Sequence, residues 1–129
     1  RKSFKGINVI LDAYNANPGS VRSALENITR MTASQKSLIL GDMKELGKYS
    51  IDLHREILNT ITSLNIFTHV ILIGSEYYQL KDEFAQYKFY QLLTDYKPDW
   101  EIFKGHLLLA KGSRSISLEK LFHDIDSMP

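Results

Sequence analysis

The chain has 129 residues, which suits one domain of ordinary size that folds around its own hydrophobic core. Its net charge of +1 provides no electrostatic attraction for nucleic acid or an anionic membrane, and it has no cysteine for disulfides or thiolate metal sites. No apolar run approaches the ~20 residues that span a bilayer. We therefore expect a cytoplasmic globular domain without membrane insertion, and, because no initiator methionine is present, a piece of a longer chain.

Strands and helices are expected to alternate along the chain. Short apolar runs rich in leucine or β-branched residues predict buried strands at 7–11, 37–40, 69–74 and 106–110. Apolar residues at helical spacing predict helices over 18–31, 51–64 and 118–125. Strands separated by helices favour a single α/β domain over residues 1–129, with a mostly parallel sheet of about five or six strands and helices on both faces.

The segment between Glu76 and Lys104 has a less regular pattern. It predicts a helix over 77–84 and a short strand over 87–92. Pro98 interrupts whatever follows, which leaves room for a short helix over 99–103.

Three polar segments follow predicted strands, at 12–18, 41–47 and 111–114. Ligands of open α/β sheets bind outside the carboxyl ends of the strands, so these segments are the candidate site. They do not form a P-loop, because five residues rather than four separate Gly41 from Gly47. The chain also lacks G-x-G-x-x-G after its first strand, a G-x-S-x-G elbow and the histidine spacing of a zinc site.

The three segments resemble, in order, the signature blocks of the C-terminal domain of the Mur ligase family. The first block reads DAYNANPGS at 12–20, and the second reads GDMKELG at 41–47 with His54 downstream. The third reads KGSR at 111–114 with Glu119 five residues on. The asparagine-rich part of the first block and the KGSR block favour the MurF-type branch, which adds D-alanyl-D-alanine to UDP-N-acetylmuramoyl-tripeptide. Val21 is a minor departure from the family pattern, in which methionine is commoner at this position.

This resemblance implies a Rossmann-like third domain that closes over the active site of a three-domain, ATP-dependent amide ligase. In such ligases ATP and the tripeptide carboxylate form an acyl phosphate, which the amine of D-alanyl-D-alanine attacks. The family's central domain carries the P-loop and the magnesium ligands, so ATP and Mg²⁺ would be bound mainly outside this chain. The partners would be the N-terminal and central domains of the same enzyme and its two peptide substrates, and the isolated chain would be inactive.

The first block is the candidate ATP-binding segment. The resemblance implies that Asp12 accepts hydrogen bonds from the ribose, with Tyr14, Asn15 and Asn17 beside it. A turn or helix cap is the structural alternative for Asp12 and Asn17, since both residue types favour such positions.

The third block is the candidate substrate-binding segment. The resemblance implies that Lys111, Ser113 and Arg114 face the peptide side of the cleft, where a guanidinium group suits a carboxylate. An ion pair with Glu119 or a solvated surface is the structural alternative for the two cations.

The second block is expected to be structural. Asp42 and Glu45 would order the loop, with an approach to the nucleotide through water as the functional alternative. His54, on the apolar stripe of its helix, would be a buried histidine bonded to that loop. No residue of the chain is expected to be catalytic or to bind a metal ion.

Two other functions remain open. One is the equivalent domain of a folate-type or cyanophycin-type ligase of the same superfamily, against which the KGSR block argues. The other is a free-standing binding module without a ligase partner domain. A P-loop block upstream of Arg1 would favour a ligase.

Overall fold

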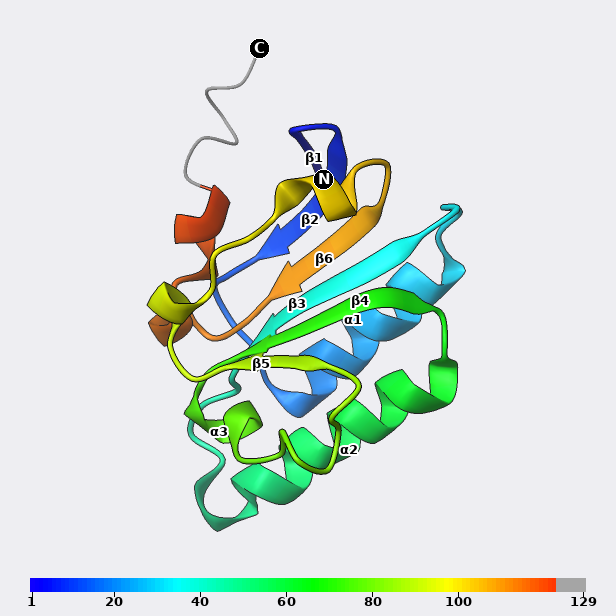
Figure 1. Cartoon of the computed structure of the whole chain (residues 1–129). Coiled ribbons are helices and arrows are strands. Elements are labelled where there is room, and N and C mark those ends of the chain that lie inside the picture. The colour runs from blue at the N-terminus through cyan, green and yellow to red at the C-terminus, as the bar shows by residue number, and fades with distance from the viewer. Residues whose placement is uncertain (123–129) are drawn as a thin grey trace.

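The computed structural model describes residues 1–122, which form a six-stranded sheet (Figure 1). The strand order is β1-β2-β6-β3-β4-β5, and every neighbouring pair is parallel except β1 and β2. The strands are β1 (Lys2–Phe4), β2 (Ile7–Asp12), β3 (Lys36–Gly41), β4 (Phe67–Ile73), β5 (Lys88–Tyr90) and β6 (Leu107–Lys111). β3 and β6 are central and buried on both faces, which explains their nearly unbroken apolar runs.

Three α-helices cover one face of the sheet: α1 (Pro18–Arg30), α2 (Ser50–Leu64) and α3 (Ser75–Tyr78) (Figure 1). The first helix starts where the sequence predicts, because Asn17 caps it and Pro18 occupies its first turn. The buried helical side chains share one core with the sheet: Val21, Leu25, Ile28, Ile57, Leu58, Ile61 and Tyr77. Within the described residues no helix is long and apolar enough to cross a membrane.

The opposite face is covered by short 3₁₀ helices rather than α-helices. These are η2 (Leu93–Asp95), η3 (Trp100–Phe103), η4 (Arg114–Ile116) and η5 (Leu118–Phe122), while η1 (Gly47–Tyr49) leads into α2. Gly105, with a φ of 79°, follows η3, and Ser117, with a left-handed φ of 62°, separates η4 from η5, so η3 and η4 do not extend into α-helices. Aromatic side chains nevertheless build a second core here, with Phe4, Phe103 and Phe122 buried against the sheet.

The α/β class and the four main strands are confirmed, and three predictions need correction. The strand predicted at 87–92 is shorter, and the helix predicted over 77–84 is α3 followed by hydrogen-bonded turns. The helix predicted over 118–125 is the 3₁₀ helix η5, and its last predicted residues lie outside the described part of the chain. Strand β1 was not predicted, because a three-residue edge strand with one apolar side chain has no periodicity. Its signal is the turn at Lys5 and Gly6, both with positive φ, which suits a two-residue hairpin.

Candidate functional site

The three blocks meet at one edge of the sheet. β2, β6 and β3 are neighbours in the sheet, and each carries one block at its carboxyl end. The register sets Asp12 opposite Lys111, and Leu40 opposite Lys111 on the other side. The last block is therefore central, between the first and second blocks.

The first and last blocks are joined by an ion pair. Lys111 is only 4% exposed, and its Nζ donates to Asp12 Oδ2 at 2.5 Å and to the Asn15 carbonyl oxygen at 2.9 Å. The Asp12 side chain keeps 45% of its surface exposed. Partial burial acts to raise the pKa of Asp12, but the hydrogen bond and charge of Lys111, together with backbone N–H donors, lower it overall. Asp12 is thus an ionised, oriented carboxylate that still faces solvent.

A second contact joins the same two blocks on the surface. Tyr14 is 76% exposed, and the Arg114 guanidinium lies over its ring at 5.4 Å from the centroid. With Leu11, Ala13 and Glu119, these two side chains line a hollow of about 330 Å³. Residues assigned separately to ATP and to the peptide are therefore in direct contact.

The asparagines of the first block have local structural roles. Asn17 is the N-cap of α1, where its side-chain oxygen accepts from the Ser20 N–H at 2.9 Å and its own N–H donates to Ser20 Oγ at 3.1 Å. The backbone carbonyl oxygen of Asn15 accepts a hydrogen bond from Lys111, and the Asn15 side chain is exposed. The cap that the sequence offers as the alternative for Asn17 is what the structure contains.

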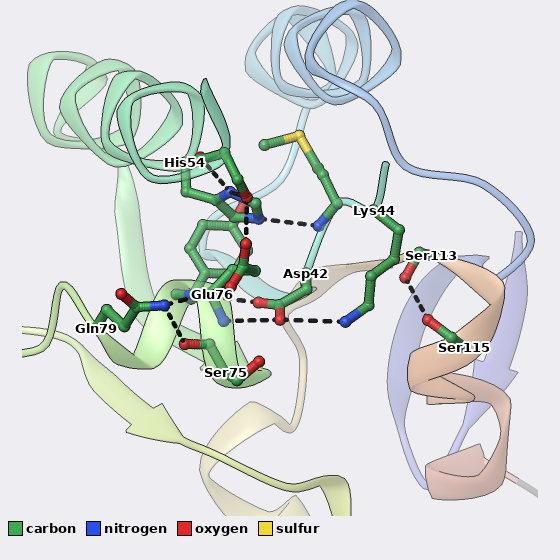
Figure 2. Close-up of polar contacts among 11 residues, drawn as sticks. Asp42, Lys44, His54, Ser75, Glu76, Gln79, Ser113 and Ser115 are labelled. Carbon is green, nitrogen blue, oxygen red and sulfur yellow. Dashed lines mark hydrogen bonds and ion pairs between the residues drawn. The ribbon is translucent and has the colours of Figure 1, made fainter. Parts of the chain in front are cut away.

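The second block is joined to the start of α3 through a buried carboxylate. Asp42 is fully buried and accepts from the N–H groups of Glu76 at 2.9 Å and Tyr77 at 3.0 Å, while Lys44 Nζ lies 3.7 Å away (Figure 2). Burial raises the pKa of Asp42, against the effect of these donors. Gly74 makes room for the carboxylate, because a Cβ on Gly74 would lie 2.2 Å from Asp42 Cγ. Sequence reasoning missed Gly74, although it is the last residue of the strand predicted at 69–74 and lies at the same edge of the sheet.

His54 holds the loop from the other side. Its Nε2 accepts from the Met43 N–H at 3.0 Å, and its Nδ1 lies 2.7 Å from the Ser50 carbonyl oxygen (Figure 2). Only a neutral ring with its proton on Nδ1 makes both bonds. Burial lowers the pKa of His54 despite the Ser50 carbonyl and the Asp42 charge, which keeps the ring neutral. Glu45 differs, since its side chain is exposed and its φ of 62° places it in a left-handed turn.

The last block also contacts the second block through its backbone. The Ser113 N–H donates to the Asp42 carbonyl oxygen at 3.1 Å, and the Gly112 N–H donates to the Asp12 carbonyl oxygen at 3.1 Å. A Cβ on Gly112 would lie 2.9 Å from Gly41 Cα, so this approach requires glycine. Ser113 is largely buried, and its Oγ lies 3.2 Å from Ser115 Oγ (Figure 2).

Comparison with known proteins decides the family. The family model described as "Mur ligase, glutamate ligase domain" matches residues 1–114. The chain belongs to the Mur ligase family. A UDP-N-acetylmuramoyl-tripeptide–D-alanyl-D-alanine ligase from Rickettsia prowazekii is 37% identical over 92% of the chain, and the same ligase from Bacillus subtilis is 31% identical over 99%. The chain spans only 27% and 30% of these two relatives, at their C-terminal part.

Solved Mur ligases have the same fold as this domain. A crystal structure of MurF from Acinetobacter baumannii matches 99% of the chain with a TM-score of 0.79 and 25% identity, and the match covers 30% of that protein. MurF from Thermotoga maritima, in complex with ADP, matches 98% of the chain with a TM-score of 0.65 and 24% identity, covering 29% of that protein. These matches confirm the Mur ligase resemblance and the mostly parallel α/β architecture. The individual site assignments remain predictions.

Proposed function

We propose that the chain is the C-terminal domain of the ligase that adds D-alanyl-D-alanine to UDP-N-acetylmuramoyl-tripeptide, in the cytoplasm, during peptidoglycan precursor synthesis. The observation that carries this proposal is the meeting of all three blocks at the carboxyl edge of one sheet. The curated relatives that match the chain bear this ligase name. The N-terminal and central domains of the same enzyme would supply the rest of the active site.

In the proposed reaction the tripeptide carboxylate takes the terminal phosphoryl group of ATP, and ADP is released. The amine of D-alanyl-D-alanine then attacks the acyl phosphate, forming an amide bond and releasing phosphate. This chain would bind and orient the reactants. Asp12, ionised and half-exposed, can accept hydrogen bonds from ribose hydroxyls. Arg114, exposed over Tyr14, can turn its guanidinium toward a substrate carboxylate.

The two assigned sides of the site would work as one surface. Asp12 is paired with Lys111, and Tyr14 is stacked with Arg114. Each of these contacts joins the first block, assigned to the nucleotide, to the third block, which contains the residue assigned to the peptide. Closure of this domain over the active site would bring both ends to the reactants together.

Magnesium does not fit the residues of this edge. Asp12, the half-exposed carboxylate at the end of β2, already accepts from the Lys111 ammonium at 2.5 Å, and this positive charge disfavours a second cation. Among the described residues no group of three or more histidine, aspartate or glutamate side chains is placed to hold a metal. We therefore assign Mg²⁺ to the central domain of the enzyme.

The test is phosphate release by the full-length enzyme with defined substrates. Release should require ATP, UDP-N-acetylmuramoyl-tripeptide and D-alanyl-D-alanine together. Activity with a folate or cyanophycin precursor instead would place the chain in another branch of the superfamily. A natural full-length protein without a P-loop domain would make the chain a binding module.

A further inference from the structure

Lys111 stands apart from the other lysines of the site, because it is buried and already bonded. Its ammonium group uses two of its three N–H donors, on Asp12 Oδ2 and on the Asn15 carbonyl oxygen. By contrast, the Lys44 side chain beside Asp42 is 42% exposed. A lysine that is 4% exposed presents almost no surface to a substrate.

The position of the pair is set by the backbone. Asp12 and Lys111 are opposite residues on neighbouring parallel strands, so the ladder between β2 and β6 fixes the separation of their Cα atoms. The second bond of Lys111, to Asn15, crosses the turn between Asp12 and α1 and fixes its shape. Asp12 Oδ1 also accepts from the Tyr14 N–H at 3.3 Å. The carboxylate is thus held through both oxygens and remains open on one side.

From this geometry we propose that Lys111 is a positioning residue, which holds Asp12 and the 13–17 turn in the geometry that receives the nucleotide, and that it does not touch the peptide substrate. This inference rests on the proposed function for its ligand. It reverses the sequence-based assignment of Lys111 to the peptide side, while Arg114 keeps that assignment.

The experiment is a double-mutant cycle in the full-length ligase, with Lys111→Met, Asp12→Asn and the double variant. Methionine keeps the length of the side chain and removes the charge. Removing one partner of an ion pair is costly where the other charge stays buried, but the Asp12 side chain is 45% exposed, so water can solvate its carboxylate in this variant. If Lys111 acts through Asp12, Lys111→Met should raise the KM for ATP roughly tenfold and leave the KM for D-alanyl-D-alanine within about twofold. The double variant should be no worse than Asp12→Asn alone.

Lys104→Met is the matched control, because it removes an exposed lysine before the amino end of the same strand and should leave both KM values unchanged. Additive effects in the cycle, or a rise in the KM for the dipeptide alone, would overturn the inference. Inactivity of the wild-type enzyme with these substrates would instead count against the proposed function.

A measurement on the wild-type chain tests the same inference without a variant and without activity. Lysine acylation followed by mass spectrometry should find Lys111 among the slowest lysines and Lys104 among the fast ones. Saturating D-alanyl-D-alanine should not change the Lys111 rate. Labelling of Lys111 as fast as Lys104, or its protection by the dipeptide, would show that Lys111 is an accessible substrate ligand and would end the proposal.

Discussion

Gly74→Ala should be among the most damaging single-methyl additions in the domain. The new Cβ would lie 2.2 to 2.4 Å from three atoms of the Asp42 carboxylate, and the backbone φ of 131° is one that L side chains rarely adopt. Backbone strain of this kind costs about 1–3 kcal/mol, and overpacking a buried site costs about 1–3 kcal/mol more. We expect the free energy of unfolding to fall by about 2–6 kcal/mol, out of the roughly 5–15 kcal/mol that is typical of a native domain.

Gly47→Ala is the matched control, because Gly47 has a φ of 57° and its Cβ would meet no atom within 4 Å. Gly47→Ala should lower the free energy of unfolding only by the strain of a left-handed backbone, about 1–2 kcal/mol. Urea unfolding of both variants measures the difference, which combines the contact with Asp42 and the more unusual backbone conformation of Gly74. Asp42→Ala in the Gly74→Ala background should recover part of that difference. Equal costs for Gly74→Ala and Gly47→Ala would refute the packing of Asp42 against Gly74.

Three further predictions concern pH, nucleotide binding and cooperativity. The pKa of His54 in the folded state lies below its unfolded value of about 6.5. The contribution of His54 to the free energy of unfolding is therefore complete above pH 6.5 and decreases as the pH falls below 6.5, because the unfolded state then binds a proton that the folded state does not. His106 contributes with the same sign and Asp42 with the opposite sign, so the check is that His54→Gln flattens the wild-type slope between pH 5.5 and 7 in urea titrations. The isolated chain should bind ATP far more weakly than micromolar by calorimetry, because it has no phosphate cradle; a Kd near 1 µM, about −8 kcal/mol, would contradict the assignment of that cradle to another domain. Its thermal unfolding should be a single sharp transition, and a broad melt would argue against an autonomous domain.

The sequence predicts where the site lies better than how its residues pair. Each block follows a buried apolar run, and the strand-end rule then brings all three to one edge. The pairing of Asp12 with Lys111 depends on β6 inserting between β2 and β3, and strand order of this kind leaves no local pattern. This is why Lys111 was grouped with Arg114, its sequence neighbour, rather than with Asp12.

In the second block, too, the partners of a side chain lie far away in the sequence. The sequence shows Asp42 next to a glycine and suggests an ordered loop. Its actual partners are the N–H groups of Glu76 and Tyr77, more than thirty residues away at the start of α3. α3 is a single short turn of helix, so no periodicity marks its beginning. Gly74 was the available signal, as a glycine at the end of a buried strand.

The central claim is that this carboxyl edge serves the ligation reaction, and Arg114→Lys in the full-length enzyme tests it most directly. Lysine keeps the charge but loses the planar fork that grips a carboxylate. We expect kcat/KM to fall by one to three decades, roughly 1.4–4 kcal/mol of transition-state stabilisation, with little change in the KM for ATP. Asp12→Ala should show the opposite preference, raising the KM for ATP more than that for the dipeptide. Arg22→Lys, the same change at an exposed position on α1, should be neutral, and both arginine-to-lysine variants should melt close to wild type. Asp12→Ala should melt lower, because it leaves the buried Lys111 ammonium without its carboxylate partner, so its KM values are measured well below its melting temperature. A fully active Arg114→Lys enzyme would contradict the account, because the KGSR loop would then be structural.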